Sequence, residues 1–352
     1  MIVAFIDFDY FFAQVEEVLN PSLRGKPVVV CVYSGRSESS GAVATCNYEA
    51  RRLGIRSGMP ISSALKLGKD KAVFLPMRKE VYKRFSDEIM NLLRKYADSL
   101  EVASIDEAFL DITNRVSNYE QAESLAISMK REILERTQIK TTVGIAPNKV
   151  LAKMAAEQAK PNGLKVVSPE RVNEFLSQVK LINVPGIGEV IADKLNKLGV
   201  RSLNDVLKAD PVKMREALGE SRYFYLLRIA RNTYEEPVKE RERRSFVRIV
   251  TLPENSHKVR TILPSLMRAI DEAYAKIDGL PMNISLIAIM EDLDTLTRTK
   301  DLKRGITKEQ AYEIVEQLLH DLLREDSRAL RRVGVKLSKI TRISGLDHFL
   351  HI

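Results

Sequence analysis

The chain has 352 residues, of which 45% are hydrophobic and 29% charged, so it can bury several cores and is not a disordered protein. Its net charge of +9 favours a polyanionic partner such as nucleic acid or an anionic membrane surface. Two cysteines, and four histidines without ligand spacing, exclude a disulfide framework and a zinc site. No apolar run is long enough to span a bilayer and no signal peptide is expected, so we predict a cytoplasmic protein.

The first elements predict a split βαβ unit. An apolar strand at 2–8 precedes a short helix, "YFFAQVEEVL", and a Gly-, Ser- and Pro-rich stretch, 21–76, has the composition of a small inserted subdomain. The apolar spacing then predicts a helix in "EVYKRFSDEIMNLLRKYA", strands at 101–105 and 108–112, a helix at 119–136 and a strand at 141–146. Without the insertion the order is β-α-β-β-α-β.

The turn in "SIDEAFLDI" places Asp106 beside Glu107. A right-handed crossover makes the first strand parallel to the strand before this turn, and the strand after it fits between them. The turn then lies at the sheet end that carries Asp7. Three converging carboxylates favour a hard cation such as Mg²⁺ or Mn²⁺, although a solvated turn is the alternative for "DE" alone. Asp9 shares the strand face of Asp7 by period and is either a further ligand or a neighbour.

The next segment predicts a DNA-binding turn. A helix in "NKVLAKMAAEQAKPNG", ended by Lys160 and a Pro-Asn-Gly turn, precedes a helix in "PERVNEFLSQV". The stretch "VPGIGEVIADKLNKLGV" then has the helix-hairpin-helix pattern, in which Gly186 and Gly188 let backbone N–H groups approach a phosphate. This predicts sequence-independent binding to the DNA backbone, and a plain helix connection is the alternative.

The stretch 232–244 is polar, highly charged and without apolar period, so we predict an interdomain linker. Its Arg241, Arg243 and Arg244 either contact phosphates or are merely solvated.

The last third repeats the order β-α-β-β-α-β. Two of its strands carry alternating basic residues, which predicts a basic sheet face for nucleic acid or, alternatively, an ordinary exposed face. The basic residues are Arg298, Lys300, Arg332 and Lys336. The expected strands are 246–252, 282–291, 295–302 and 331–339, and the expected helices are 258–277 and 307–325.

Five ordered motifs, "FIDFDYFFAQVEE", "SGAVATCNYEARRLGI", "SIDEAFLDI", "AKPNG" and "VPGIG", together resemble the Y-family translesion DNA polymerases, with the archaeal DNA polymerase IV type as the best match. The resemblance covers essentially the whole chain. It implies an α+β multidomain fold with a ferredoxin-like palm, inserted small fingers, a helical thumb and a β-α-β-β-α-β little finger. The implied bounds are palm 1–10 and 77–166, fingers 11–76, thumb 167–231, linker 232–244, little finger 245–341 and a clamp-binding tail 342–352.

The resemblance implies template-directed addition of deoxynucleotides to a primer 3′-hydroxyl, with low fidelity and no proofreading. Asp7, Asp106 and Glu107, assisted by the Phe8 carbonyl, become ligands of two Mg²⁺ ions, with Mn²⁺ as a substitute. Phe12 resembles the steric gate that excludes a ribose 2′-hydroxyl, although Phe11 and Phe12 are both core residues in the alternative. The implied nucleotide contacts are Phe11, Phe12, Thr45, Tyr48, Arg51 and Lys160, under a roof of Gly41, Ala42 and Ala44.

The tail "RISGLDHFLHI" resembles a sliding-clamp-binding peptide but departs from the strict pattern. Ile343 stands where Gln is usual and Leu350 where a second aromatic residue is usual, so we expect weaker binding than is typical of the family. Together with Leu346 and Phe349 they form an apolar set that either docks on the clamp or folds back on its own domain.

The expected partners are primer–template DNA, a deoxynucleoside triphosphate and the sliding clamp, with no membrane and a monomeric chain. The competing hypothesis is a non-catalytic DNA-binding accessory protein that binds the clamp. Intact carboxylates at Asp7, Asp106 and Glu107 argue against it, because an inactive protein has no use for their mutual repulsion.

Overall fold

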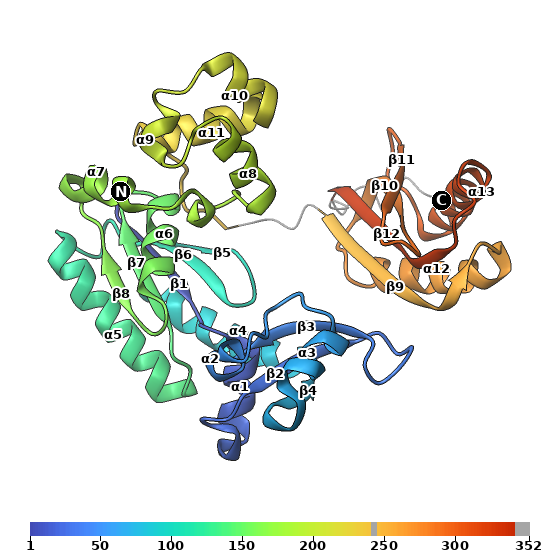
Figure 1. Ribbon diagram of the computed structural model, residues 1–352, viewed down its shortest axis with the longest axis horizontal. Helices are drawn as coiled ribbons and strands as arrows, with labels where there is room; N and C mark the ends of the chain where they lie inside the picture. The colour runs from blue at the N-terminus through green and yellow to red at the C-terminus, as the bar shows by residue number, and fades with distance from the viewer. Residues whose placement is uncertain (241–244, 342–352) are drawn as a thin grey trace, which may run out of the picture. The chain divides into compact units, whose positions relative to one another are not determined.

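The computed structural model describes residues 1–240 and 245–341 (Figure 1). The described residues divide into two compact units, one of 1–32 and 42–240 and the other of 33–41 and 245–341. Within these ranges no helix has the length and apolar character needed to cross a membrane. The predicted DNA contacts Arg241, Arg243 and Arg244 lie outside the described residues, as do the predicted clamp contacts Ile343, Leu346, Phe349 and Leu350.

The first unit is built around a five-stranded sheet, called here the palm sheet, with the order β5-β6-β1-β7-β8. Strand β6 lies between β5 and β1 and is antiparallel to both, so β1 and β5 run parallel, as the sequence predicted. The last strand, β8, was not expected, because it is only three residues long and follows a Pro-Asn-Gly turn. The bounds are β1 Val3–Asp7, β5 Ser99–Val102, β6 Glu107–Asp111, β7 Thr142–Ala146 and β8 Leu164–Val166.

Both faces of the palm sheet are covered by helices. Along β1, Ala4 and Ile6 join the core under α1 (Phe11–Leu19), α4 (Lys79–Arg94) and α5 (Tyr119–Thr137). Val3 and Phe5 join the other core, under α6 (Lys149–Ala159) and the thumb helices. A strand buried on both faces requires the continuous apolar run seen in "VAFI".

Helix α1 belongs to the palm core by packing, although we expected it in the fingers. Its Phe11, Ala13 and Val15 are buried together with palm residues, because an amphipathic helix directly after β1 can return over the sheet. The fingers proper have a separate core around a small sheet with the order β3-β2-β4. Their elements are η1 Pro21–Leu23, β2 Val28–Tyr33, β3 Gly41–Cys46, α2 Tyr48–Arg52, α3 Ile61–Gly68, η2 Lys69–Lys71 and β4 Val73–Pro76.

The thumb is helical, as expected. Gly186 precedes α8 with a φ of 83°, a backbone conformation that favours glycine, and the segment before this turn is a short 3₁₀ turn rather than a full α-helix. A second helix–glycine–helix connection occurs at Gly219. The elements are η3 Pro169–Arg171, α7 Val172–Gln178, η4 Leu181–Asn183, α8 Glu189–Lys197, α9 Leu203–Val206, α10 Pro211–Leu218 and α11 Glu220–Ala230.

The described part of the expected linker is attached to the palm. Val238 is 6% exposed, and its carbonyl accepts a hydrogen bond from Ser99 Oγ at 3.0 Å. The Lys239 N–H donates to Glu101 Oε2 at 3.3 Å. One apolar side chain and two hydrogen bonds therefore hold this part of the expected linker against the edge strand β5.

The second unit has the predicted β-α-β-β-α-β order and an antiparallel sheet, called here the little-finger sheet, with the order β11-β10-β12-β9. One face buries an aliphatic core under α12 and α13. The elements are β9 Ser245–Ser256, α12 Val259–Tyr274, β10 Leu280–Met290, β11 Thr295–Asp301, α13 Lys308–Glu325 and β12 Leu330–Thr341.

Candidate active site

Three carboxylates meet at one end of the palm sheet. Asp7 ends β1 and Glu107 begins β6, and the two residues are direct cross-strand partners. The Phe8 N–H donates to the Asp106 carbonyl at 3.0 Å, which holds the turn against the end of β1. Like charges directly opposite each other on a sheet are destabilising, so this end of the sheet requires compensating positive charge.

Two lysines supply that charge. Lys160 Nζ lies 2.7 Å from Asp7 Oδ2, and Lys153 Nζ lies 2.7 Å from Glu107 Oε2. Asp106 Oδ1 accepts from Ser104 Oγ at 2.5 Å. With the carboxylates held by these partners, no three His, Cys, Asp or Glu side chains in the described residues already form a metal-binding cluster.

Asp7 is nevertheless an unfavourable place for a negative charge. Burial raises the pKa of its carboxyl to about 6; Lys160 opposes the increase, and Asp9 and Asp106 add to it. A cluster of carboxylates with only oxygen donors and a surplus of negative charge fits a hard divalent cation. Binding such a cation requires the lysines to move away from Asp7 and Glu107.

Asp9 is a neighbour of the cluster rather than part of it. Its carboxylate accepts from Thr142 Oγ1 at 2.9 Å and from the Asn162 N–H at 2.8 Å. It leaves the strand because its φ is 30°, and that of Tyr10 is 26°, both in a sparsely populated region for residues with side chains. The strained turn directs the Asp9 carboxylate toward β7 and the Asn162 turn.

Gln14 is a functional candidate that the sequence reasoning missed. Its buried Nε2 donates to the carbonyls of Phe8 at 3.0 Å and of Asp9 and Lys140 at 3.1 Å. The Phe8 carbonyl, an expected metal ligand, is therefore oriented by Gln14 and retains one lone pair. A polar residue on the buried face of the helix in "YFFAQVEE" was the available signal.

A cavity of about 740 Å³ lies beside the carboxylates, between the β1–α1 turn, α2 and the Asn162 turn. Tyr48 and Arg51 line it, as expected, and the Arg51 guanidinium lies 4.7 Å from the centre of the Tyr48 ring. The expected contacts Thr45 and Lys160 are not in its lining. The lining residues are Asp9, Tyr10, Tyr48, Glu49, Arg51, Arg52, Arg56, Lys140, Pro161 and Asn162, so three arginines and a lysine make it suitable for an anion.

The two expected sugar contacts, Phe11 and Phe12, differ in burial. Phe11 is 2% exposed and packs edge-on against Phe8, which leaves its side chain almost no surface for a nucleotide. Phe12 is only half-buried, and its ring stacks on Tyr82 with 4.7 Å between centroids. The expected roof residues Gly41, Ala42 and Ala44 lie on β3, all half-buried.

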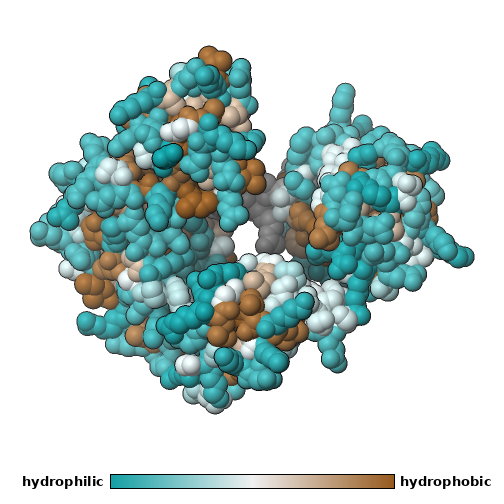
Figure 2. All heavy atoms as spheres, in the orientation of Figure 1, coloured by the Kyte–Doolittle hydropathy of each residue, from teal (hydrophilic) through white to brown (hydrophobic). Residues whose placement is uncertain are grey.

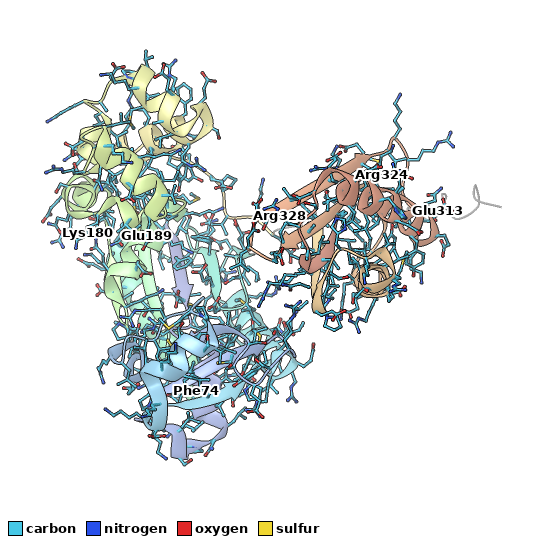
Figure 3. The ribbon with its side chains drawn as sticks, turned by 45° about the vertical axis from the view of Figure 1, so that its right-hand side comes forward. Phe74, Lys180, Glu189, Glu313, Arg324 and Arg328 are labelled. Atoms are coloured by element: carbon cyan, nitrogen blue, oxygen red, sulfur yellow. The ribbon has the colours of Figure 1, made fainter. Side chains whose placement is uncertain are left out.

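The thumb turn has the geometry of a phosphate site. Gly188 is the N-cap of α8 and supplies no capping side chain, so backbone N–H groups of the first helical turn remain available. Tyr225 Oη donates to the Pro185 carbonyl at 2.9 Å and fixes the turn. Glu189, labelled in Figure 3, begins the helix.

The four basic residues predicted for one face of the little-finger sheet lie on both faces. Arg332 and Lys336 pair with Ile289 and Ser285 on the face opposite the helices, where both basic side chains are exposed.

Arg298 and Lys300 instead pair with the core residues Leu286 and Ile284, on the helix-covered face. Arg298 also forms an ion pair with Glu325 of α13. The prediction of one basic face was wrong for this pair, because alternation within a strand does not tell which face is buried. The visible surface in Figure 2 is mainly hydrophilic.

Residues 6–157 match the model of the impB/mucB/samB family. The chain is 54% identical over 351 residues to a DNA polymerase IV of Metallosphaera sedula and 52% identical over 351 residues to one of Sulfurisphaera tokodaii, in each case covering 100% of both chains. A solved Y-family DNA polymerase chimera of Dbh and Dpo4 matches with a TM-score of 0.94 and 53% identity, covering 97% of this chain and 100% of that chain. An insertion ternary complex of Dbh DNA polymerase matches with a TM-score of 0.73 and 52% identity over the same shares.

Proposed function

The chain belongs to the Y-family of translesion DNA polymerases, and from this premise we propose how its residues divide the work of nucleotide addition. It is a metal-dependent, DNA-directed DNA polymerase that binds DNA and an incoming nucleotide. The alternative of a non-catalytic accessory protein is therefore wrong.

Asp7, Asp106, Glu107 and the Phe8 carbonyl hold two Mg²⁺ ions, for which Mn²⁺ can substitute. The observation that carries this assignment is the pairing of Asp7 and Glu107 with lysines at one sheet end, since the Lys153–Glu107 pair is partly exposed and Lys160, the partner of the buried Asp7, is itself 25% exposed. When bound, the ions lower the pKa of the primer 3′-hydroxyl and offset the charge of the triphosphate. Lys160, released from Asp7, is then free to donate to a phosphate oxygen.

The arginine-rich cavity receives the triphosphate. Arg51, stacked on Tyr48, presents its guanidinium to phosphate oxygens, and Arg52 and Arg56 add positive charge. Lys140 lines the other side of the same cavity. Thr45, the penultimate residue of β3, is the further hydroxyl donor in this assignment.

Phe12 lies under the deoxyribose and excludes a 2′-hydroxyl, and the small residues Gly41, Ala42 and Ala44 cover the nascent base pair. Little bulk above the base pair means weak shape selection, and this favours lesion bypass at low fidelity. The half-buried state of all four residues supports contact with a substrate.

Primer extension with Mg²⁺ tests the metal assignment. Asp106→Ala or Glu107→Ala should remove nucleotide incorporation while DNA binding, measured by fluorescence anisotropy, stays largely intact. Asp111→Ala is the matched control, because Asp111 ends the same strand and its carboxylate accepts from Thr113. Extension by Asp106→Ala at the wild-type rate would refute the assignment.

Competition between deoxyribo- and ribonucleotides tests the gate. Phe12→Ala should admit ribonucleotides much better than wild type, whereas Phe12→Tyr, which keeps the ring, should not. An unchanged preference for deoxyribonucleotides in Phe12→Ala would show that Phe12 only packs.

The remaining assignments concern partners. The protein acts as a cytoplasmic monomer that binds duplex phosphates through the thumb turn at Gly186 and Gly188, with Arg241, Arg243 and Arg244 as further contacts. The tail 342–352 binds the sliding clamp. Deleting the tail should leave basal extension unchanged and abolish clamp stimulation; equal stimulation without the tail, or a large loss of thermal stability, would contradict this assignment.

A further inference from the structure

The ring of Phe12 rests on a second aromatic ring. Tyr82 of α4 stacks on it almost in parallel, with 4.7 Å between centroids and 17° between planes. Phe12 is half-buried, whereas Tyr82 is completely buried. One side of the Phe12 ring is therefore covered by a residue that cannot itself reach solvent.

Tyr82 is fixed in turn by a buried carboxylate. Its hydroxyl donates to Glu16 Oε1 at 2.5 Å, and Arg78 Nε donates to the same oxygen at 2.9 Å. A second hydrogen bond joins the Arg78 guanidinium to Glu16 Oε2, so the arginine binds the carboxylate with both oxygens engaged. Burial, followed by the hydrogen bond to Glu16, raises the pKa of the Tyr82 hydroxyl, so Tyr82 remains a donor at neutral pH.

Helix geometry joins these contacts into one support. Glu16 follows Phe12 by four residues on α1, so both side chains project from the same helix face. Tyr82 spans both: its ring covers Phe12 and its hydroxyl reaches Glu16. Arg78, at the N-cap of α4, links the start of that helix to α1.

Packing alone does not require this arrangement. Glu16 is only 4% exposed, but the Arg78 side chain is 45% exposed, and an ion pair that is open to solvent contributes little to stability. The carboxylate instead fixes the orientation of the Tyr82 ring. Arg78 holds Glu16 through two hydrogen bonds, and Glu16 accepts from the Tyr82 hydroxyl. An apolar filler would leave that ring free to shift with its neighbours.

A steric gate is selective only to the extent that its side chain is held rigidly in place. If the surroundings are loose, the gate side chain can leave its preferred rotamer to admit a ribonucleotide. The energetic cost of that movement corresponds to a rate difference of only about 2- to 10-fold. A ring that must also displace a close-packed neighbour resists more strongly, because overpacking a core costs additional free energy. That cost corresponds to a further factor of roughly 5 to 100 in the rate. Selectivity against a 2′-hydroxyl therefore depends on what stands behind the gate.

We propose that Glu16, Tyr82 and Arg78 form a rigid support behind Phe12 and thereby set how strictly the polymerase excludes ribonucleotides. The inference rests on the proposed role of Phe12 as the sugar gate. These three are positioning residues: none is assigned a contact with the nucleotide, and they act through the Phe12 ring.

The test compares incorporation efficiency, the maximal rate divided by the apparent dissociation constant of the nucleotide, for a deoxyribonucleotide and the matching ribonucleotide. Tyr82→Leu removes the platform, and we expect the ratio of the two efficiencies to fall roughly tenfold or more. Tyr82→Phe keeps the ring and loses only the hydrogen bond to Glu16, so a fall of about 2- to 5-fold is expected. In both variants the gain should come mainly from ribonucleotide incorporation, whereas general damage would lower both efficiencies.

Tyr96→Phe is the matched control, because the Tyr96 hydroxyl also donates to a glutamate, Glu132, at a site without contact to Phe12. It should leave the ratio unchanged. Tyr82→Phe also guards against misfolding of Tyr82→Leu, since it changes a single atom, and thermal melts report whether each variant is folded.

Two results would overturn the inference. If Phe12→Ala lowers the ratio but both Tyr82 variants keep it at the wild-type value, Phe12 is the gate and its support has no role. If Phe12→Ala also leaves the ratio unchanged, the gate assignment fails and the support has nothing to act on. A lowered ratio in Phe12→Ala and both Tyr82 variants, with Tyr96→Phe unchanged, supports the proposal.

Discussion

Two lysines one turn apart on α6 have the same kind of partners and different surroundings. Lys149 Nζ lies 5.3 Å from the centre of the Phe109 ring and 2.8 Å from Glu101 Oε2. Lys153 Nζ lies 4.9 Å from the centre of the Phe5 ring and 2.7 Å from Glu107 Oε2.

Exposure separates the two pairs. The side chains of Lys149 and Glu101 are 5% and 2% exposed, whereas those of Lys153 and Glu107 are 34% and 23% exposed. Residues 232–240 account for part of the difference, since Lys239 donates its N–H to Glu101 and Glu236 lies 3.4 Å from Lys149.

The difference teaches that the same ion pair can be structural or exchangeable. A sealed pair must stay together, because separating it leaves a charge buried without compensation. A pair that reaches solvent contributes little to stability, and its glutamate can exchange the lysine for an incoming cation. We infer that the enzyme keeps Glu101 for the fold and Glu107 for the metal.

The largest expected effect concerns catalysis. Glu107→Gln keeps the shape of the side chain and removes its charge, so we expect nucleotide incorporation to fall on the order of 10²- to 10³-fold or more. Glu101→Gln should change the rate of the folded enzyme far less. Single-turnover extension on one primer–template measures both, and equal losses would end the distinction between the two glutamates.

The same comparison predicts the reverse order for stability. Lys149→Met leaves Glu101 buried without its cation and should lower the free energy of unfolding by about 3–5 kcal/mol. For Lys153→Met, whose pair is partly solvated, we expect a loss below about 1 kcal/mol. Guanidinium unfolding in EDTA gives both values; a larger loss for Lys153→Met would contradict the assignment.

The protonation of Asp7 makes the stability of this end of the sheet depend on pH. Because the pKa of its carboxyl is raised from 3.8 to about 6, its contribution to stability is present below pH 3.8 and is lost as the pH rises through about 6. Lys160, Asp9 and Asp106 are the charged groups that act on it.

In EDTA, Asp7→Asn should therefore gain stability relative to wild type between pH 4 and pH 7.5, by up to about 3 kcal/mol. Lys160 keeps Glu157 as a partner at 2.9 Å, which limits the loss from removing Asp7. Urea unfolding at the two pH values measures the difference. A relative loss for Asp7→Asn as the pH rises would have the wrong sign.

The smallest effect tests the two faces of the little-finger sheet. DNA affinity should fall with salt and be nearly independent of sequence, with a slope of log K against log salt of about −0.9 per phosphate neutralised. Lys336→Met should reduce that slope by about one phosphate, and Arg298→Met, on the helix-covered face, should not change it. A smaller salt slope for Arg298→Met, with no change for Lys336→Met, would support the original prediction that Arg298 lies on the DNA-binding face.

The sequence was sufficient for the topology and for the meeting of the carboxylates. The handedness of the crossover and the position of "DE" between two strands place Asp7 next to Glu107 without any knowledge of side-chain packing. In the second unit the same element order gives a different sheet, because β12 rather than β11 lies between β9 and β10.

What could not be predicted depends on how elements pack on each other. That Lys153 reaches Glu107 depends on the position of α6 over the sheet, and the turn of Asp9 away from Asp7 depends on its unusual φ. Arg56 lies outside α2 and still lines the cavity, which the spacing of apolar residues in the sequence does not indicate.

Binding of Mn²⁺, followed by electron paramagnetic resonance, tests the central claim most directly. The protein is titrated on a primer with a dideoxy end and with the incoming nucleotide present, so that no turnover occurs. We predict that Glu107→Gln binds Mn²⁺ at least about tenfold more weakly than wild type. Lys153→Met, which removes the competing cation, should bind Mn²⁺ at least as tightly as wild type. Wild-type affinity in Glu107→Gln, together with weaker binding in Lys153→Met, would show that the exposed pair is as structural as the sealed one.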